Sequence, residues 1–401
     1  MTRRMSMMKS ATQPRPVGGI RARRWSWALA VGAVTGLAAS LAAPATASPA
    51  HHARDFQQIN LVSDQPGVAA LTDPDLVNAW GMSASPGTDA APGSPLWVSD
   101  NGTDKTTLYN GAPMPTLISK FLAVDVTSGA PTGQVFNQVS ATDPTGFVVS
   151  DAAGNSGASR FIFASEEGGI DGWNPGVGKA APSEPLSTHT EVEVRNGANA
   201  VYKGLAMATA SDGHTYLYAA NFRSGRVEVY DDTWTPVELP GGLFVDRRIP
   251  AGYAPFNVQE LEGKLYVTYA KQDAGLEDDV AGQGHGFVDV FTNDGAFVRR
   301  LVTRGVLNSP WGLALAPNGF GRLGGALLVG NFGNGRINAF DPTTGRYEGQ
   351  LRGAHGHPIT IDGLWALMFG NGNAAQTDEL LFSAGPDDES HGLLGKIVAD
   401  M

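Results

Sequence analysis

The sequence predicts an all-β protein: a six-bladed β-propeller closed by pairing of its N- and C-terminal strands. Three observations carry this prediction. The 401 residues include 52 Gly and 25 Pro while only 17% are charged, a composition typical of many short strands joined by tight turns. A unit of short apolar strands recurs six times along the chain. The last unit lacks a fourth strand, and a suitable segment stands near the other end of the chain.

The repeat is clearest in residues 310–341 and 204–231. Both contain an Asn-Phe pair followed closely by Gly-Arg and an alternating strand, Ile-Asn-Ala-Phe-Asp in one and Val-Glu-Val-Tyr-Asp in the other. Weaker copies occupy 78–109, 146–173, 257–291 and 364–398, and the innermost strand of the copy at 146–173 is placed at 146–149. The second strands of the six copies are expected to start at residues 96, 161, 217, 265, 327 and 380. Six such units favour a closed propeller, with an open repeat or two sandwiches as the alternative.

The fourth strand of the last blade is predicted at residues 57–62, Gln-Gln-Ile-Asn-Leu-Val. Its pairing with the C-terminal strand would close the ring and remove an exposed sheet edge. Residues 56–400 are therefore expected to form a single propeller domain, preceded by a flexible tail at 48–55.

Two stretches of the repeat resemble known families. Residues 310–319 and 327–341 are similar to an NHL repeat. Across 56–400 the chain also resembles an uncharacterised family of exported bacterial propeller proteins. Four segments carry that resemblance: Asn60–Asp64, Leu76–Gly81, Leu96–Gly102 and Asn331–Gly335. The resemblance implies the propeller fold and brings no established activity.

The first 47 residues have the pattern of a bacterial signal peptide. They hold seven Lys and Arg residues and no acidic residue, followed by an apolar stretch at 25–43 and by Ala45-Thr46-Ala47, a small-x-small cleavage site. The alternative is an uncleaved membrane anchor, because nineteen apolar residues are just long enough to span a bilayer. The Arg23-Arg24 pair leaves open whether export uses the general or the twin-arginine route. We expect a secreted, extracellular protein.

Charge and cysteine content exclude several function classes. Without residues 1–47, 21 Lys and Arg residues stand against 39 Asp and Glu, a net charge near −18. Such a surface repels nucleic acid and anionic lipid, so neither is an expected partner. With no cysteine, the chain has no disulfide framework, no thiolate metal site and no cysteine nucleophile. We expect a monomer.

One face of the predicted ring is the candidate ligand face. In a propeller the innermost strand of a blade begins on the face where the second strand ends, and the loops there surround the central channel. The residues that the repeat alignment projects onto this face are Asn78, Asp100, Asn101, Glu166, Glu167, Asn221, Asn257, His285, Trp311, Asn331, Asp362 and His391.

Four of these residues are candidate calcium ligands. Calcium takes oxygen ligands, and six-bladed hydrolases of the gluconolactonase type, which the predicted fold resembles, build such a site from Glu, Asn and Asp of different blades. The corresponding candidates here are Asp100, Glu166, Asn221 and Asn331. The alternative is that these Asn and Asp side chains only close tight turns.

The remaining aromatic and ionisable residues also have two interpretations. His285 and His391 are either solvated turn residues or, paired with a Glu, acid–base groups. Trp80, Trp311 and Trp365 recur at the start of three inner strands and are expected to pack between blades, with sugar-stacking as the alternative. No Gly-x-Ser-x-Gly, Gly-Lys-Ser/Thr or His-Glu-x-x-His motif is present in the sequence.

Two functions remain open. The first is an extracellular binding or interaction module for a protein, glycan or small molecule. The second is a calcium-dependent, lactonase-like hydrolase or lyase with its site on the channel face, in which calcium is the Lewis acid. The binding module is preferred because no catalytic constellation stands out from ordinary turn chemistry.

Overall fold

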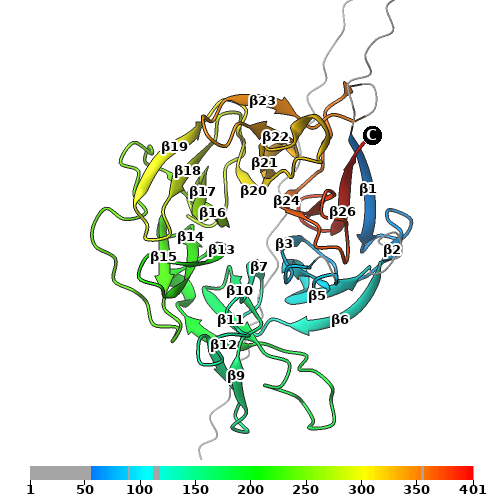
Figure 1. The fold of residues 1–401 in the computed structure, drawn as a ribbon, viewed down its shortest axis with the longest axis vertical. Helices are drawn as coiled ribbons and strands as arrows, with labels where there is room; N and C mark the ends of the chain where they lie inside the picture. The colour runs from blue at the N-terminus through cyan, green and yellow to red at the C-terminus, as the bar shows by residue number, and fades with distance from the viewer. Residues whose placement is uncertain (1–55, 89–90, 112–117, 354–355, 401) are drawn as a thin grey trace, which may run out of the picture. The chain divides into compact units, whose positions relative to one another are not determined.

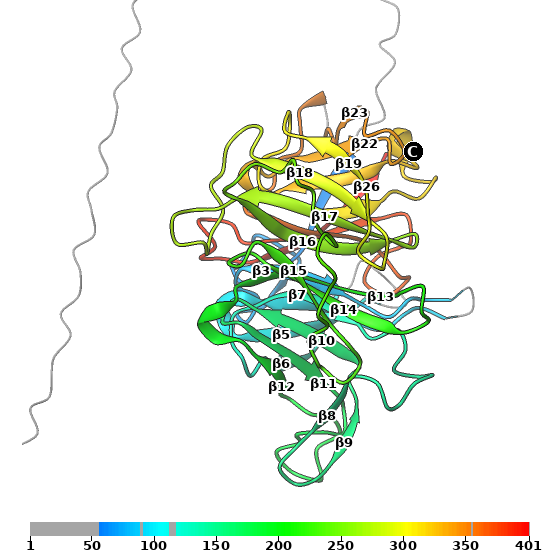
Figure 2. The ribbon, with the colours of Figure 1, turned by 90° about the vertical axis from the view of Figure 1, so that its left-hand side faces the viewer.

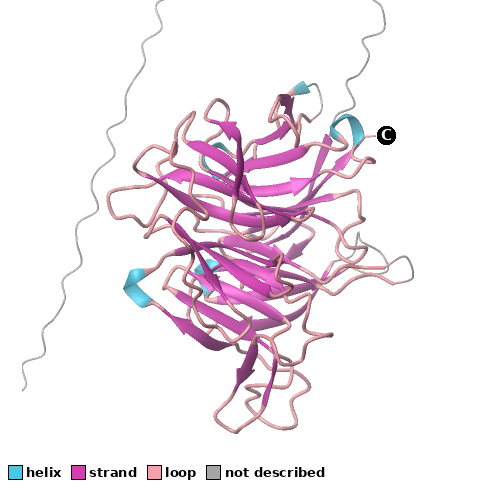
Figure 3. Ribbon diagram, turned by 60° about the vertical axis from the view of Figure 1, so that its left-hand side comes forward, coloured by secondary structure: helices cyan, strands magenta, loops and turns pink. Residues whose placement is uncertain are grey.

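A computed structural model describes residues 56–400, except 89–90, 112–117 and 354–355. The predicted signal peptide at 1–47 and the predicted tail at 48–55 lie outside the described residues. Six antiparallel sheets surround a common centre, as the six-bladed propeller requires (Figure 1). Strands and short 3-10 turns make up the regular structure, and the described residues contain no α-helix (Figure 3). None of their helical segments has the length and apolar character needed to cross a membrane.

The first three blades follow one another along the chain, and the innermost strand of each blade comes first in the sequence. Blade 1 contains β3 (Ala79–Ser83), β4 (Leu96–Asp100), β5 (Lys105–Asn110) and β6 (Ser119–Asp125). Blade 2 contains β7 (Pro131–Phe136), β10 (Phe161–Ser165), β11 (Gly169–Trp173) and β12 (Glu191–Arg195). Blade 3 has three strands, β13 (Tyr202–Thr209), β14 (Thr215–Asn221) and β15 (Arg226–Tyr230).

The other three blades complete the ring. Blade 4 contains β16 (Tyr253–Leu261), β17 (Lys264–Lys271), β18 (Gly286–Phe291) and β19 (Phe297–Thr303). Blade 5 contains β20 (Pro310–Leu315), β21 (Leu327–Asn331), β22 (Ile337–Phe340) and β23 (Tyr347–Gln350). Blade 6 contains β24 (Leu364–Phe369), β25 (Leu380–Ala384), β26 (Leu393–Ala399) and β1 (Phe56–Ser63), with β2 (Leu71–Thr72) added beside β1.

The closure of the ring is confirmed. β1 pairs antiparallel with β26 from Phe56↔Ala399 to Ser63↔Leu393, so the first described strand is the fourth strand of the last blade. The two strands, blue and red in Figure 1, lie side by side. Phe56, Leu61 and Val62 are buried by this pairing. Burial of apolar residues and the hydrogen bonds between β1 and β26 therefore both favour the closed ring.

The second strands begin at or within two residues of the predicted starts, but the inner strand of blade 2 was predicted wrongly. That strand is β7 (Pro131–Phe136), which pairs with β10. Residues 146–149 belong instead to an inserted hairpin of β8 (Val148–Ser150) and β9 (Ser156–Ala158), at the bottom of Figure 1. Residues 146–149, Gly-Phe-Val-Val, carry the stronger apolar signal in the sequence, whereas β7, Pro-Thr-Gly-Gln-Val-Phe, is half polar.

Every inner strand carries a β-bulge at the same place. The pairing register between the first and second strands shifts at residues 80–81, 132–133, 203, 256, 311–312 and 365–366. A bulge bends the strand and redirects a side chain. The residues at the six bulges are Trp80, Thr132, Lys203, Phe256, Trp311 and Trp365.

Four of the six bulge residues are followed by glycine, because the inner strands pack against one another there. A Cβ atom on Gly133 would lie 2.5 Å from the backbone nitrogen of Leu205, and one on Gly204 would lie 2.7 Å from Cα of Asn257. Gly81 and Gly312 are equally close to the neighbouring backbone, at 2.3 Å and 2.6 Å. Glycine at these positions allows the ring to close around a narrow centre.

The four aromatic bulge side chains, together with Phe332 from the turn after β21, fill that centre. Trp80 stacks on Trp365 with ring centroids 3.6 Å apart, and Phe332 stacks on Trp365 at 3.9 Å. The ring centroids of Trp311 and Phe256 lie 6.0 Å and 5.8 Å from that of Trp365. The three tryptophans are therefore packing residues, as preferred from the sequence, but they meet in the channel rather than between blades. This aromatic plug divides the channel into two mouths.

The two mouths differ in which strand ends surround them. In all six blades the first residues of the inner strand pair with the last residues of the second strand, for example Ala79↔Asp100 and Tyr202↔Asn221. The face predicted from the alignment is therefore a real face of the ring, which Figure 2 shows from the side. We call its central opening the upper mouth.

Candidate functional site

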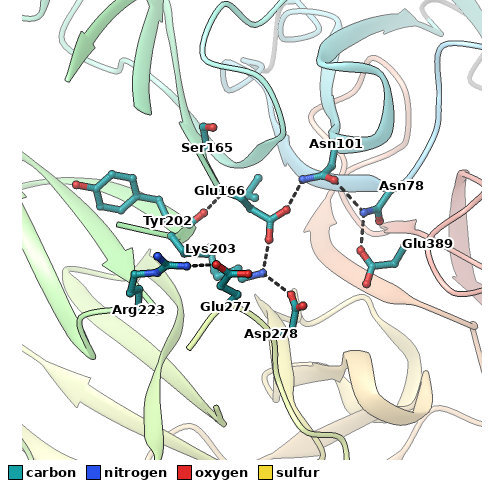
Figure 4. A network of polar contacts seen from close by, with 12 residues as sticks. Asn78, Asn101, Ser165, Glu166, Tyr202, Lys203, Arg223, Glu277, Asp278 and Glu389 are labelled. Atoms are coloured by element: carbon teal, nitrogen blue, oxygen red, sulfur yellow. Dashed lines mark hydrogen bonds and ion pairs between the residues drawn. The ribbon is translucent and has the colours of Figure 1, made fainter. Parts of the chain in front are cut away.

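A network of polar side chains occupies the upper mouth (Figure 4). Six residues form its centre, and each comes from a different strand or loop: Asn78, Asn101, Glu166, Lys203, Asp278 and Glu389. Asn78 and Lys203 stand at the start of inner strands, and Asn101 and Glu166 directly follow second strands. Asp278 and Glu389 lie in the loops β17–β18 and β25–β26. We refer to these six residues as the mouth network.

Lys203 is the buried centre of the network. It occupies the bulge position of blade 3, where the other five blades have aromatic residues or Thr. Its side chain is 2% exposed and its ammonium group lies 5.1 Å from the centre of the Trp80 ring. It forms ion pairs with Glu166 and, at 3.3 Å, with Asp278. Burial alone would lower the pKa of Lys203, but the carboxylates of Glu166 and Asp278 raise it above its usual value, so the lysine stays charged.

A chain of amides connects two carboxyl groups across the mouth. The second oxygen of Glu166 accepts a hydrogen bond of 2.8 Å from Nδ2 of Asn101. Nδ2 of Asn78 donates to Oδ1 of Asn101 at 3.2 Å and to Oε2 of Glu389 at 2.6 Å. Oδ1 of Asn78 accepts a bond of 2.9 Å from the indole of Trp365. The network is therefore fixed to the aromatic plug below it.

Glu389 is the titratable group of the network in the neutral range. Burial raises its pKa to about 7, and the carboxylates of Glu166 and Asp278 add to this effect. The amide of Asn78 and the ammonium of Lys203 act in the opposite direction. Glu389 therefore changes its charge near pH 7, whereas Lys203 does not.

Asp279 and Ser309 lie next to the network. Burial raises the pKa of Asp279, opposed by the hydroxyl of Ser309 and by the charge of Lys203. Ser309 is completely buried. Oδ2 of Asp279 and Oγ of Ser309 have no partner in hydrogen-bonding geometry among the described residues. Both oxygen atoms are closed to solvent, and the Ser309 hydroxyl is the donor that faces Asp279.

A pocket of about 450 Å³ opens beside the network. Its charged lining consists of Glu166, Glu167, Glu277, Asp278 and Arg223, and its small residues include Gly197 and Ala198. Arg223 forms an ion pair with Glu277 along one wall. Four carboxylates against one guanidinium, with Lys203 buried behind them, give the pocket a negative charge.

The four candidate calcium ligands do not form one group. Asp100 is completely buried, and burial raises its pKa well above the usual value; the charged residues that influence it are Asp73, Lys120 and Asp75. Asn221 donates to Glu228 at 2.7 Å. Within the described residues, no set of three or more His, Cys, Asp or Glu side chains is arranged to hold a metal ion.

Asn331, the fourth candidate ligand, donates to the backbone oxygen of Val306 at 2.8 Å and to Asn334 at 3.2 Å. Of the four, Glu166 is the one that belongs to the mouth network.

Other predicted face residues are divided between the two mouths and the ring itself. Trp311 is part of the aromatic plug and its indole donates to the backbone oxygen of Lys203 at 3.1 Å. Asn257 stands at the narrowest part of the ring, where it donates to the backbone oxygen of Trp311 at 2.9 Å. Asn257 and Trp311 also line a second pocket of about 330 Å³ at the opposite mouth.

The predicted histidines make local contacts on the same face. Nδ1 of His285 lies 2.7 Å from the backbone oxygen of Val280. Nδ1 of His391 lies 2.7 Å from Oδ2 of Asp64. Asp362 is exposed and accepts a hydrogen bond of 2.9 Å from the backbone N–H of Asp387. The structure thus brings Asn78, Asn101 and Glu166 together with Glu167 beside them, and places the two histidines and Asp362 outside the network.

Sequence reasoning missed Lys203, Asp278 and Glu389. For Lys203 a signal was available: Lys203-Gly204 aligns with Trp80-Gly81, Trp311-Gly312 and Trp365-Ala366, so a lysine replaces a tryptophan at a repeat position. Asp278 and Glu389 stand in loops without a repeat register, so no comparable signal exists for them.

Comparisons with known proteins identify relatives of the whole domain. The chain is 34% identical over 349 residues to the uncharacterised protein R648 of Acanthamoeba polyphaga mimivirus, with 85% of the chain and 79% of that protein covered. It is 35% identical over 349 residues to the uncharacterised protein L690 of the same virus, with 85% of each covered. No protein-family model matches the chain.

Among solved structures, the chain is similar to the aldose sugar dehydrogenase of Streptomyces coelicolor in its PQQ-bound form. The identity is 12%, the alignment covers 86% of the chain and 99% of that protein, and the TM-score is 0.45. A likeness at this level says nothing about activity. The viral relatives are close enough to assign a family: the chain belongs to the same propeller family as the mimivirus proteins R648 and L690.

Proposed function

We propose that this protein is an exported binding module that holds an extracellular ligand at its upper mouth. The observation that carries this proposal is the buried ion-pair network around Lys203. A charged lysine replaces an aromatic residue at a position that five other blades fill without charge. A buried ion pair is weak evidence for stability, and clusters of perturbed charged groups are concentrated at functional sites.

Binding explains the mouth better than metal-dependent catalysis does. Of the four residues considered for a calcium-dependent hydrolase, Glu166 is in the network and already pairs with Lys203. Asn221 and Asn331 bond within the ring. The upper mouth instead offers a pocket beside a fixed set of acceptors and charges, an arrangement typical of a ligand site.

The rest of the proposal concerns location and partners. Residues 1–47 would direct export, as in the exported bacterial propellers and NHL-type proteins that the repeat resembles. The ligand would be a small molecule or the side chains of an extracellular partner, and the domain would act as a monomer. N-terminal sequencing of protein collected from the medium tests the export step: a start at Ser48 supports it, and a retained precursor contradicts it.

Ligand binding is tested by thermal shift on residues 48–401 with four classes of probe: amines, sugars, carboxylic acids and lactones. A ligand that binds the folded state raises Tm with the logarithm of its excess over Kd. We expect at least one class to raise Tm by a few degrees. Ala198→Trp, at the rim of the pocket, should remove that shift, whereas Ala153→Trp, in the turn of the β8–β9 hairpin, should not.

Two results would contradict the proposal. One is the absence of any shift at millimolar concentrations of all four classes. The other is a shift that Ala198→Trp leaves unchanged, because binding would then lie elsewhere. Turnover of a lactone that requires calcium and is lost in Glu166→Gln would favour the hydrolase instead.

A further inference from the structure

The opposite end of the channel, which we call the lower mouth, contains a pocket of about 330 Å³. Residues from the inner strands of all six blades line it. Gly81, Gly133 and Trp311, at the bulges of three blades, belong to this lining, so the aromatic plug forms the inner end of the pocket. A pocket of this size accommodates a small organic molecule.

The methionines of the folded domain are concentrated in this pocket. Met82, Met207 and Met368 are the three methionines among the described residues, and all three line it. They stand two, four and three residues after the bulge residue of their strands, so the repeat does not account for their meeting. Methionine side chains adapt to the shape of an apolar ligand, and their sulfur atoms make favourable contacts with aromatic rings.

The lining of the pocket is almost uncharged. Glu260 is the one charged residue in it, and its Oε1 accepts a hydrogen bond of 2.6 Å from the backbone N–H of Gly263. The amide of Gln134 is used inside the ring, where it donates to the backbone oxygen of Gly81 at 2.7 Å. A charged ligand would find no partner of opposite sign here except Glu260, so the lining favours a neutral molecule.

Part of the apolar lining is open to solvent. Met82 and Met207 are 9% and 6% exposed, whereas Met368 and Phe136 are half-buried. An apolar group that covers Met368 and Phe136 removes this surface from water, which favours binding. Gln138 is exposed beside them, and its amide forms no hydrogen bond with another described residue.

We propose that the lower mouth binds a neutral aromatic molecule, with its ring against Met368 and Phe136. Gln138 and Gln259, which both line the pocket, supply amides for one hydrogen-bonding group of the ligand. This inference goes beyond the proposed function, because it assigns a second site that the aromatic plug separates from the upper mouth.

Fluorescence titration of residues 48–401 with N-phenyl-1-naphthylamine tests the proposal. This probe is neutral, has two aromatic groups and one N–H donor, and becomes fluorescent in apolar surroundings. We expect saturable binding that Gln259→Trp, which narrows the opening, weakens at least about tenfold. Gln57→Trp places the same side chain at an exposed position of β1, outside the pocket, and should leave binding unchanged.

The half-buried Met368 provides a pair of milder variants. Met368→Leu keeps an apolar side chain of similar volume and should change the affinity less than about threefold. Met368→Gln keeps the length of the side chain but places an amide against the ring, and should weaken binding about tenfold. Equal affinities of the Leu and Gln variants would contradict a contact between Met368 and the aromatic group.

Oxidation by hydrogen peroxide locates the probe. Exposed methionine is converted to its sulfoxide, and a bound ligand should slow this reaction at Met368 by at least about threefold. Tryptic cleavage leaves Met82, Met207 and Met368 in separate peptides, 55–105, 204–223 and 353–396, each with a single methionine, so mass spectrometry follows each site by itself. Saturable binding without protection of Met368 would place the probe elsewhere and overturn the inference.

Two further results would overturn it. One is the absence of saturable binding in the wild type. The other is binding that Ala198→Trp removes, because the probe would then occupy the pocket beside the upper mouth. Neither result decides the proposed function, which stands or falls with the thermal shifts and their loss in Ala198→Trp.

Discussion

Replacing Glu389 with Gln should make the stability of the domain less dependent on pH. Burial raises the pKa of Glu389 from 4.5 to about 7 in the folded protein. Below pH 4.5 the carboxyl group is protonated in both the folded and unfolded states. As the pH rises toward 7, the unfolded state loses this proton first, so folding becomes less favourable. Gln resembles the protonated carboxyl group in shape and has no proton to lose.

The size of the effect follows from the pKa difference. A shift from 4.5 to about 7 corresponds to a ceiling of about 3 kcal/mol. Because Glu389 is only half-buried, solvent screening reduces this to about 1–2 kcal/mol. A domain of about 345 residues unfolds with an entropy of about 0.7 kcal/mol per degree, so the expected change in Tm is about 2 °C.

Differential scanning calorimetry at pH 5, 6, 7 and 8 measures this directly. The Tm of Glu389→Gln relative to wild type should rise steadily from pH 5 to pH 8. Glu238→Gln, an exposed substitution with the same change in charge, provides the baseline. A difference between Glu389→Gln and wild type that is the same at all four pH values would refute the assignment of a raised pKa to this group.

Three further predictions concern the ring and its centre. Gly204→Ala should lower the free energy of unfolding by about 3 kcal/mol and Tm by about 4 °C, because its Cβ would meet the backbone of Asn257 at 2.7 Å. Gly241→Ala, with no atom within 4 Å, should be close to neutral, and equal Tm values for the two variants would contradict the close packing of the inner strands. A chain that begins at residue 64 should aggregate, because β26 loses its partner β1, whereas a chain that begins at residue 55 should stay monomeric; size-exclusion chromatography distinguishes them. In chemical denaturation, Lys203→Met alone should lower the free energy of unfolding by about 3 kcal/mol, because it leaves Glu166 without its buried partner. The double variant Lys203→Met, Glu166→Gln should recover part of that loss, and additive losses would show that the two side chains do not interact.

The fold was largely predictable because it depends on patterns that repeat. Strands such as Leu327–Asn331 and Leu380–Ala384 are short apolar runs with turn residues after them, and the same pattern recurs six times. The inner strand of blade 2 was missed for the opposite reason. Its sequence, Pro-Thr-Gly-Gln-Val-Phe, suits a tight bulge and a close approach at Gly133 and lacks apolar alternation.

The site was only partly predictable. Asn78, Asn101 and Glu166 stand at repeat positions, so the alignment placed them on the correct face. Asp278 and Glu389 were not found, because loop residues reach the mouth through the path of the chain in three dimensions. The alignment also grouped Asp100 with these residues, although its side chain is completely buried and responds to Asp73 and Lys120. A strand end fixes where a residue lies along the ring, but not which way its side chain points.

The bulges explain why fold and candidate site meet at the same positions. One local distortion is repeated in six inner strands, and five of the side chains at these bulges meet at the centre of the ring: Trp80, Lys203, Phe256, Trp311 and Trp365. Where that side chain is Trp or Phe, it fills the channel and stabilises the ring. Where it is Lys203, the same geometry holds a charge under the carboxylates of Glu166 and Asp278. A lysine at this point contributes less to packing than an aromatic residue would, and the buried charge must be compensated by residues from other blades. Such a departure from the repeat is expected where a function is retained at the cost of stability.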